Sequence, residues 1–241
     1  MALRKMAQEL FPAPNLGLLL TVCFQSVILS CSRLIGSEMS RAQHISRASR
    51  KATYQDVLDA PPHLVAEVVA GTLHMQPRPA KRHAWASSVM GIEIGAPFGR
   101  GKGGPGGWAI LFEPELHLGE DIVVPDIAGW RRDTLSEDMD GEYFTQAPDW
   151  VCEVLSPSTR GFDKGKKRAI YSREKVAHLW FLDPDAQTLE AFELRNALWV
   201  LLATLVDDAP VSLPPFDAIS FPLSVLWPEV VATVVGERED S

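Results

Sequence analysis

Two acidic residues stand inside stretches that are otherwise apolar. Asp126 follows Ile122–Val124 and Pro125, and Glu153 lies within Trp150–Leu155. An isolated buried carboxylate costs several kcal/mol unless it is paired, protonated or bound to a metal ion. The pair therefore marks a candidate site. The alternative is that each acid lies at an exposed strand edge or pairs with an arginine.

Lys167 is the third candidate. It follows Asp163 by four residues and precedes Tyr171 by four, so the three side chains fall on roughly one stripe of a helix. This helix comes directly after the strand of Glu153, so the ammonium group of Lys167 can approach the two acids. The alternative is a solvated amphipathic helix in which Asp163 and Lys167 form an ion pair.

These residue types suit the hydrolysis of a phosphodiester. Asp126, Glu153 and the backbone carbonyl of Val154 would form an all-oxygen site for Mg²⁺ or Mn²⁺. Lys167 would position or deprotonate the attacking water and offset negative charge on the phosphate. We expect Lys167→Ala to abolish cleavage and, as the loss of a surface lysine, to change stability by about 0.5 kcal/mol or less.

The hydropathy pattern predicts elements that position these residues. A short helix begins after Thr53, two strands at 64–69 and 72–76 form a hairpin, and a longer helix lies within 80–98. Further along we expect strands at 108–118, 121–130 and 150–156, a helix at 159–176, a hairpin at 177–194, and another strand from Trp199. Such alternation predicts a single α/β domain with an α+β mixed sheet flanked by helices.

The segment around these acids resembles a known family. "VVPDIAGW", "APDWVCEVLSPST" and "DKGKKRAIYSREKVAHLWFLDP" are similar to motifs of the Uma-two restriction endonuclease family, which belongs to the PD-(D/E)xK nuclease superfamily. The resemblance runs from about Tyr54 to Leu194. It implies a restriction-endonuclease-like fold and metal-dependent hydrolysis of DNA by an endodeoxyribonuclease.

The resemblance also assigns roles to residues. Asp126, Glu153 and Lys167 match the family's acidic and lysine positions. Supporting roles are implied for Glu67, which with Gly71 resembles the family's hairpin motif, for His83, which opens the following helix, and for Tyr171. In the parent superfamily the lysine stands two residues after the glutamate, whereas this chain has Leu155 there. The resemblance implies that the lysine has moved to the next helix, at Lys167.

Other chemistry finds less support in the sequence. The six histidines form no H-E-x-x-H or H-x-x-x-H pair, which argues against a zinc hydrolase. "GRGKGGPGG" lacks the G-K-[ST] ending of a phosphate-binding loop. The net charge of −8 argues against a general polyanion binder, yet basic stretches flank the acidic 113–149 segment and allow a local DNA groove. We therefore expect DNA as substrate, and the alternative is a catalytically silent fold that binds nucleic acid or a protein.

The ends of the chain are expected to lie outside this domain. Residues 1–38 contain an apolar stretch that reads as a mis-set start, an export signal or a membrane anchor, in that order of preference. Residues 39–52 form a basic lead-in, 53–230 the nuclease-like domain and 231–241 a polar tail. The chain is expected to be a cytoplasmic prokaryotic protein with no small-molecule cofactor and no stable membrane partner. A homodimer is left open.

Overall fold

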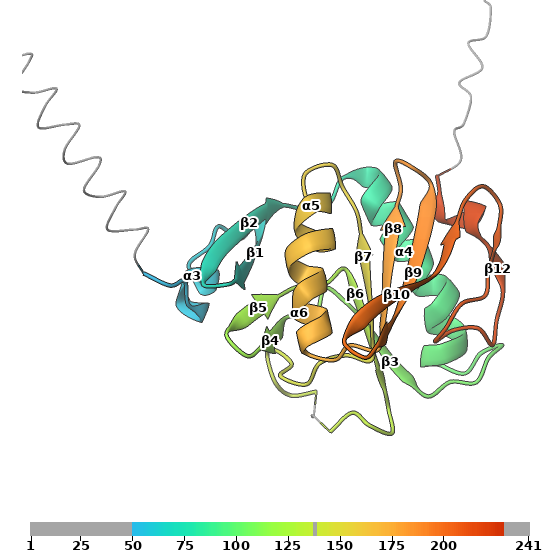
Figure 1. The fold of residues 1–241 in the computed structure, drawn as a ribbon, viewed down its shortest axis with the longest axis horizontal. Coiled ribbons are helices and arrows are strands. Elements are labelled where there is room, and N and C mark those ends of the chain that lie inside the picture. Colours follow the sequence, from blue (N-terminus) through green and yellow to red (C-terminus); the bar gives the residue numbers. More distant parts are fainter. Residues whose placement is uncertain (1–49, 137–138, 229–241) are drawn as a thin grey trace, which may run out of the picture. The chain divides into compact units, whose positions relative to one another are not determined.

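The computed structural model describes residues 50–136 and 139–228 (Figure 1). By its contacts the chain divides after Lys51, and the described residues from Ala52 onward belong to the second unit. The expectations for residues 1–38, for nearly all of 39–52 and for 231–241 concern parts outside the described residues. The proposed domain limits remain predictions. Among the described residues, no helix is both long and apolar enough to span a membrane.

A six-stranded mixed sheet forms the centre of the second unit, in the order β10-β9-β8-β7-β6-β3. Only β7 and β8 pair in parallel, and the other neighbours are antiparallel. The six strands are β3 (Trp108–Phe112), β6 (Ile127–Arg131), β7 (Trp150–Val154), β8 (His178–Asp183), β9 (Thr188–Arg195) and β10 (Leu198–Leu205).

A smaller antiparallel sheet with the order β2-β1-β5-β4 lies beside the large one (Figure 1). Its strands are β1 (Leu64–Val69), β2 (Thr72–Pro77), β4 (Leu116–Leu118) and β5 (Asp121–Val123). The β1–β2 hairpin turns at Ala70 and Gly71, which both have positive φ (52° and 70°) and so match the twist of a two-residue hairpin turn. A two-stranded sheet pairs β11 (Pro210–Val211) with β12 (Phe221–Pro222).

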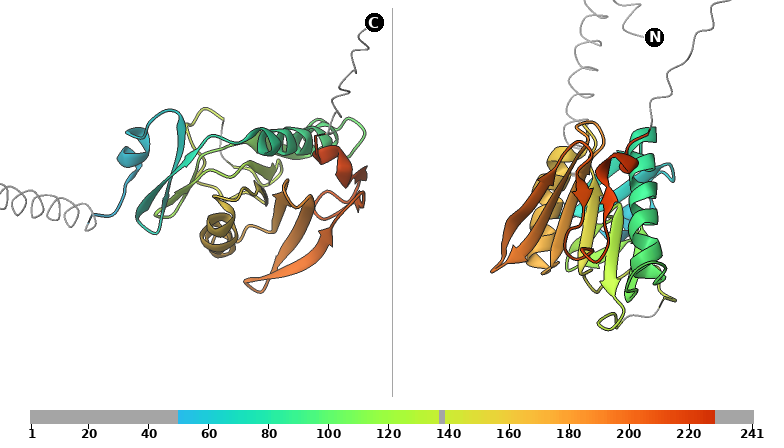
Figure 2. Two further views of the ribbon diagram at one scale, coloured as in Figure 1. Left: turned by 90° about the horizontal axis from the view of Figure 1, so that it is seen from above. Right: turned by 90° about the vertical axis from the view of Figure 1, so that its right-hand side faces the viewer.

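Helices cover both faces of the large sheet (Figure 2). One face carries α4 (Lys81–Ile94), which continues into the π-helical turn η1 (Gly95–Gly99). The other carries a nearly continuous helix made of α5 (Arg160–Phe162), the π-helical turn η2 (Asp163–Lys167) and α6 (Arg168–Arg173). The short helices α3 (Tyr54–Leu58) and η3 (Leu223–Leu226) complete the described elements.

Strand β7 divides its side chains between the two faces, because successive residues of a strand point to opposite sides. Trp150, Cys152 and Val154 join the core under α4, whereas Val151 joins the core under α6. Glu153 therefore faces the α5–η2–α6 side. This alternation directs one acid of the central strand toward the helix that carries Lys167.

The α+β mixed-sheet architecture agrees with the sequence prediction, and so do both hairpins. Two differences concern the stretches 108–118 and 121–130, which were each expected to be one strand. The first is interrupted at Glu113, which has a positive φ of 46° and precedes Pro114. The second ends at Val123 and resumes at Ile127, because Pro125 has no backbone N–H to donate to a ladder.

Candidate active site

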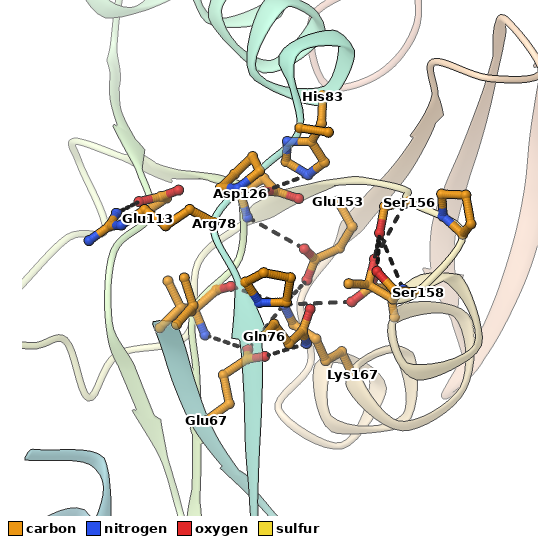
Figure 3. Close-up of a pocket in the computed structure, with 18 residues that line it drawn as sticks. Glu67, Gln76, Arg78, His83, Glu113, Asp126, Glu153, Ser156, Ser158 and Lys167 are labelled. Carbon is orange, nitrogen blue, oxygen red and sulfur yellow. Dashed lines mark hydrogen bonds and ion pairs between the residues drawn. The ribbon is translucent and has the colours of Figure 1, made fainter. Parts of the chain in front are cut away.

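A cleft of about 380 Å³ opens where the β1–β2 hairpin, α4, the connection between β5 and β6, β7 and η2 meet (Figure 3). Its lining comes from these five segments, from the turn after β7 and from the connection between β3 and β4: Val65, Glu67, Gln76–Ala80, His83, Glu113, Val124, Asp126, Glu153, Ser156–Thr159, Asp163 and Lys167. All three predicted catalytic residues, and the supporting residues Glu67 and His83, line this one cleft. Tyr171 lies behind it, against Glu153.

Glu153 is held from the helix side. Its Oε1 accepts hydrogen bonds from the Lys167 Nζ at 2.8 Å and the Tyr171 hydroxyl at 2.5 Å. Its Oε2 lies 3.4 Å from the backbone N–H of Asp126, a long and therefore weak contact. Burial, followed by the nearby acids Asp163 and Asp126, raises the pKa of Glu153 well above its usual value, against the opposing charge of Lys167.

Lys167 is enclosed by acceptors. Its Nζ lies 2.9 Å from the carbonyl oxygen of Val124, 2.8 Å from Glu153 Oε1 and 3.1 Å from Glu67 Oε1. An ammonium has three hydrogens, and these three oxygens account for them. Burial alone would lower the pKa of Lys167, but the carboxylates of Glu153 and Glu67 raise it well above its usual value. The lysine is thus a buried, charged centre.

The expectation that Lys167 behaves as a surface lysine is wrong, because its side chain is only 4% exposed. The predicted stripe does face the sheet, since Asp163, Lys167 and Tyr171 are all buried. A π-helical turn lies within this stripe, and the N–H of Arg168 bonds to the carbonyl of Asp163, five residues back. Burial raises the pKa of Asp163 to about 6.

Glu67 anchors the hairpin to the site. Its Oε1 accepts the backbone N–H of Val124 at 2.8 Å, and its Oε2 accepts the side-chain amide of Gln76 at 3.2 Å. Together with the Lys167 contact, these bonds use both carboxylate oxygens. Glu67 therefore supports Lys167 and the Val124 peptide rather than presenting a free oxygen to the cleft.

Asp126 and His83 form the open side of the site. Asp126 immediately precedes β6 instead of lying within a strand as expected, and its side chain is 19% exposed. Its Oδ2 accepts the backbone N–H of Val154 at 2.8 Å, and its Oδ1 lies 3.1 Å from His83 Nε2. Burial lowers the pKa of His83, but Asp126, with lesser contributions from Asp163 and the Val154 backbone, outweighs it and raises that pKa.

Two comparisons with known proteins find similarity to this chain. The sequence pattern of the Uma2 family, described as "Putative restriction endonuclease", matches residues 52–225. The chain belongs to the Uma2 family. A crystal structure of "a putative nuclease belonging to DUF820 from Anabaena variabilis ATCC 29413" is similar in fold, with a TM-score of 0.59 and 21% identity over 73% of this chain and 97% of that one. No curated protein matches this chain.

Family membership confirms the predicted resemblance and supports a nuclease. The similar crystal structure confirms the nuclease-like fold. Neither comparison identifies the site residues, the metal or the substrate of this Uma2 protein, so these remain predictions.

The donor set of this Uma2 protein suits a hard cation. Among the described residues, no cluster of three or more His, Cys, Asp or Glu side chains has the arrangement of a metal site. Two carboxylate oxygens nevertheless face the cleft without a strong lysine or arginine partner: Asp126 Oδ1 and Glu153 Oε2. Mg²⁺ is commonly held by one or two carboxylates and several waters. Asp126, Glu153 and the Val154 carbonyl therefore fit Mg²⁺ or Mn²⁺.

Sequence reasoning missed the role of Val124 in this Uma2 site. The backbone N–H of Val124 donates to Glu67, and its carbonyl oxygen accepts from Lys167. Both backbone polar atoms of Val124 are therefore bound by side chains instead of by a neighbouring strand. The signal was present in the sequence, since Pro125 directly after an apolar run interrupts strand pairing. Nothing in the sequence indicated that two side chains would take over these hydrogen bonds.

Proposed function

We propose that this Uma2 protein is a metal-dependent endonuclease that hydrolyses DNA phosphodiester bonds in an active site formed by Asp126 and Glu153. The carrying observation is that the two acids reach one cleft, Asp126 from the connection between β5 and β6 and Glu153 from β7. Each has one oxygen held inside the protein, and the other faces the cleft, beside His83 in Asp126 and beside the Asp126 N–H in Glu153. Preorganised groups of this kind contribute most where charge develops in the transition state.

Asp126, Glu153 and the backbone carbonyl of Val154 would hold Mg²⁺ or Mn²⁺. When bound, such an ion supplies Lewis-acid polarisation of the phosphate and a more acidic water. The protein's own contribution is to fix the two carboxylates: the Val154 N–H holds Asp126, and Lys167 with Tyr171 holds Glu153.

Lys167 is a positioning residue in this proposal. Its three hydrogens are taken by Val124, Glu153 and Glu67, so it orients Glu153 and balances buried charge instead of touching water. His83 is the basic side chain that contacts Asp126 inside the cleft. We assign to His83 the contact with the phosphate or with the attacking water.

Nicking of supercoiled plasmid DNA by the purified full chain tests the proposal. We expect conversion to open-circle and linear forms with Mg²⁺ or Mn²⁺, and none with EDTA or in Asp126→Asn and Glu153→Gln. Activity that persists in both variants would refute the site.

The second candidate is a catalytically silent fold that binds nucleic acid or a protein. The contacts of Lys167 favour it, because Val124, Glu153 and Glu67 take all three hydrogens of its ammonium and leave none to bind a water in the cleft. DNA binding in EDTA, measured by fluorescence anisotropy, without cleavage under any divalent metal would select this candidate.

A further inference from the structure

The cleft carries more negative than positive charge, although the proposed substrate is itself negative. Five of its lining side chains are acids: Glu67, Glu113, Asp126, Glu153 and Asp163. The basic lining side chains are Arg78, His83 and Lys167. A phosphate that enters the cleft beside these acids needs a cation to bind it, in addition to any metal ion held by Asp126 and Glu153. The three basic side chains differ in how well each could meet it.

Arg78 is the basic lining side chain that has room for a phosphate. The ammonium hydrogens of Lys167 are all bound inside the protein, and His83 is 12% exposed and already contacts an acid of the site. Arg78 is 62% exposed, and its contacts are long. Its Nη1 lies 3.8 Å from Glu113 Oε2, and its Nη2 lies 3.5 Å from the Pro62 carbonyl oxygen. Neither contact has the length of a strong hydrogen bond, so the guanidinium can take a new acceptor.

The backbone that carries Arg78 is restrained on both sides. Arg78 follows the end of β2 and lies between Pro77 and Pro79, shortly before α4. Proline fixes its own φ and favours an extended conformation in the residue before it. The backbone at Arg78 therefore has little freedom, whereas its long side chain is free to turn the guanidinium toward the cleft. A ligand can recruit this group without a rearrangement of the fold.

Glu113 reaches the same part of the cleft from a strained backbone. Its φ of 46° lies in the left-handed region, which residues other than glycine rarely adopt. Its backbone N–H donates a hydrogen bond to the carbonyl oxygen of Asp126 at 3.1 Å, and Pro114 follows it in the chain. Figure 3 shows the side chains of Glu113 and Arg78 beside each other, near Asp126. The strained position thus places a carboxylate where it meets the Arg78 guanidinium.

We propose that Arg78 and Glu113 form an exchangeable anion site, in which a DNA phosphate displaces the Glu113 carboxylate from the Arg78 guanidinium. An exposed ion pair of this length contributes little to stability, so the protein loses little when it opens. A guanidinium and a phosphate, by contrast, form two parallel hydrogen bonds of good geometry. The inference rests on the proposed function in taking DNA as the ligand of this cleft, but it does not require cleavage.

The ion pair between Arg195 and Glu193 provides a matched control. It lies on β9, outside the residues that line the cleft, and its side chains are similarly exposed, at 58% and 32%. Glu193 accepts hydrogen bonds from both Nε and Nη2 of Arg195. Neutral substitutions in this pair change the net charge of the protein by the same amount as those at Arg78 and Glu113. They therefore separate the effect of the cleft from that of overall charge.

Fluorescence anisotropy of a labelled DNA duplex with the full chain in EDTA measures binding without cleavage. Arg78→Gln should raise the Kd about tenfold and lower the salt dependence by about one phosphate contact. Glu113→Gln should lower the Kd about threefold, because the guanidinium no longer has to leave an acid. Arg195→Gln and Glu193→Gln should each stay within about twofold of wild type. A wild type that binds no duplex, or an Arg78→Gln variant that binds as wild type does, would overturn the inference.

The double variant Arg78→Gln/Glu113→Gln tests the exchange itself. If Glu113 acts by occupying Arg78, its replacement should bring little gain once Arg78 is gone. An equal gain with and without Arg78 would show that Glu113 simply repels DNA, and would overturn the exchange. Thermal melting checks that each variant is folded. Plasmid nicking separates this inference from the proposed function: a wild type that binds through Arg78 and never nicks refutes the endonuclease alone. Nicking with binding that is independent of Arg78 refutes the anion site alone.

Discussion

The two carboxylates that face the cleft are held in opposite ways. Glu153 is 1% exposed and bound by a buried lysine and a buried tyrosine, whereas Asp126 is 19% exposed and bound by a backbone N–H and a partly exposed histidine. The Lys167 side is saturated with protein partners. On the His83 side, Nδ1 has no hydrogen-bond partner among the described residues. The saturated side should therefore control folding, and the open side should control chemistry.

Removal of Lys167 should have the largest effect. Lys167→Met leaves Glu153 and Glu67 buried without their cation, so we expect the free energy of unfolding to fall by about 3–5 kcal/mol. Denaturant unfolding measures this loss. The control is Lys166→Met, an exposed neighbour that should change stability by about 0.5 kcal/mol or less. Equal stabilities of the two variants would contradict the assignment of Lys167 to the saturated side.

His83→Gln should separate activity from stability. If His83 contacts the phosphate or the water, cleavage should drop by about 10²–10⁴-fold, in the range of general acid–base groups. Stability should change by about 1 kcal/mol or less, because the side chain is partly exposed and makes one hydrogen bond. His74→Gln, at a histidine on β2 that contacts Phe162, is the matched control. Plasmid nicking at equal enzyme concentration compares them, and equal rates would remove His83 from the chemistry.

Asp163 should give the saturated side a pH dependence. Its pKa of about 6 lies above the usual value of 3.8, so the folded state binds more protons than the unfolded state between these values. This group's contribution to stability should therefore fall as the pH rises from about 4 to 6. Asp163→Asn does not titrate, and relative to wild type it should gain up to about 3 kcal/mol between pH 4 and pH 7. Urea unfolding at several pH values measures this difference. Free energies of unfolding that change with pH in the same way in both proteins would contradict the raised pKa of Asp163.

Tyr171→Phe should destabilise the protein less than Lys167→Met does. It removes one hydrogen bond to Glu153 while keeping the ring in the core, so we expect a loss of about 1.5–3 kcal/mol in stability. Cleavage should fall because Glu153 is less firmly oriented. DNA binding in EDTA should stay unchanged. A variant with normal stability would show that the saturated side depends on Lys167 alone.

Sequence reasoning found the elements better than it found their environments. The apolar run of β7 and the Ala70-Gly71 turn were predictable, because burial and turn geometry leave direct marks on residue type. The sequence placed Lys167 on one helical stripe with Asp163 and Tyr171 but left open whether this stripe faces the strand of Glu153 or solvent. The near-complete burial of Lys167 was not predicted, because it depends on Glu67 and Val124, which lie far away in the sequence.

Because Lys167 lies on the helical segment after β7, the position that directly follows this strand is taken by an apolar residue. Leu155, directly after β7, is 2% exposed and packs in the core under α6. When the α5–η2–α6 segment packs on the sheet, it places the positive charge of Lys167 beside Glu153 and covers Leu155 at the same time. A chain with that segment detached would lose both at once, which makes partial opening of the site costly. The charge balance of the cleft and the cooperativity of folding thus rest on the same helix.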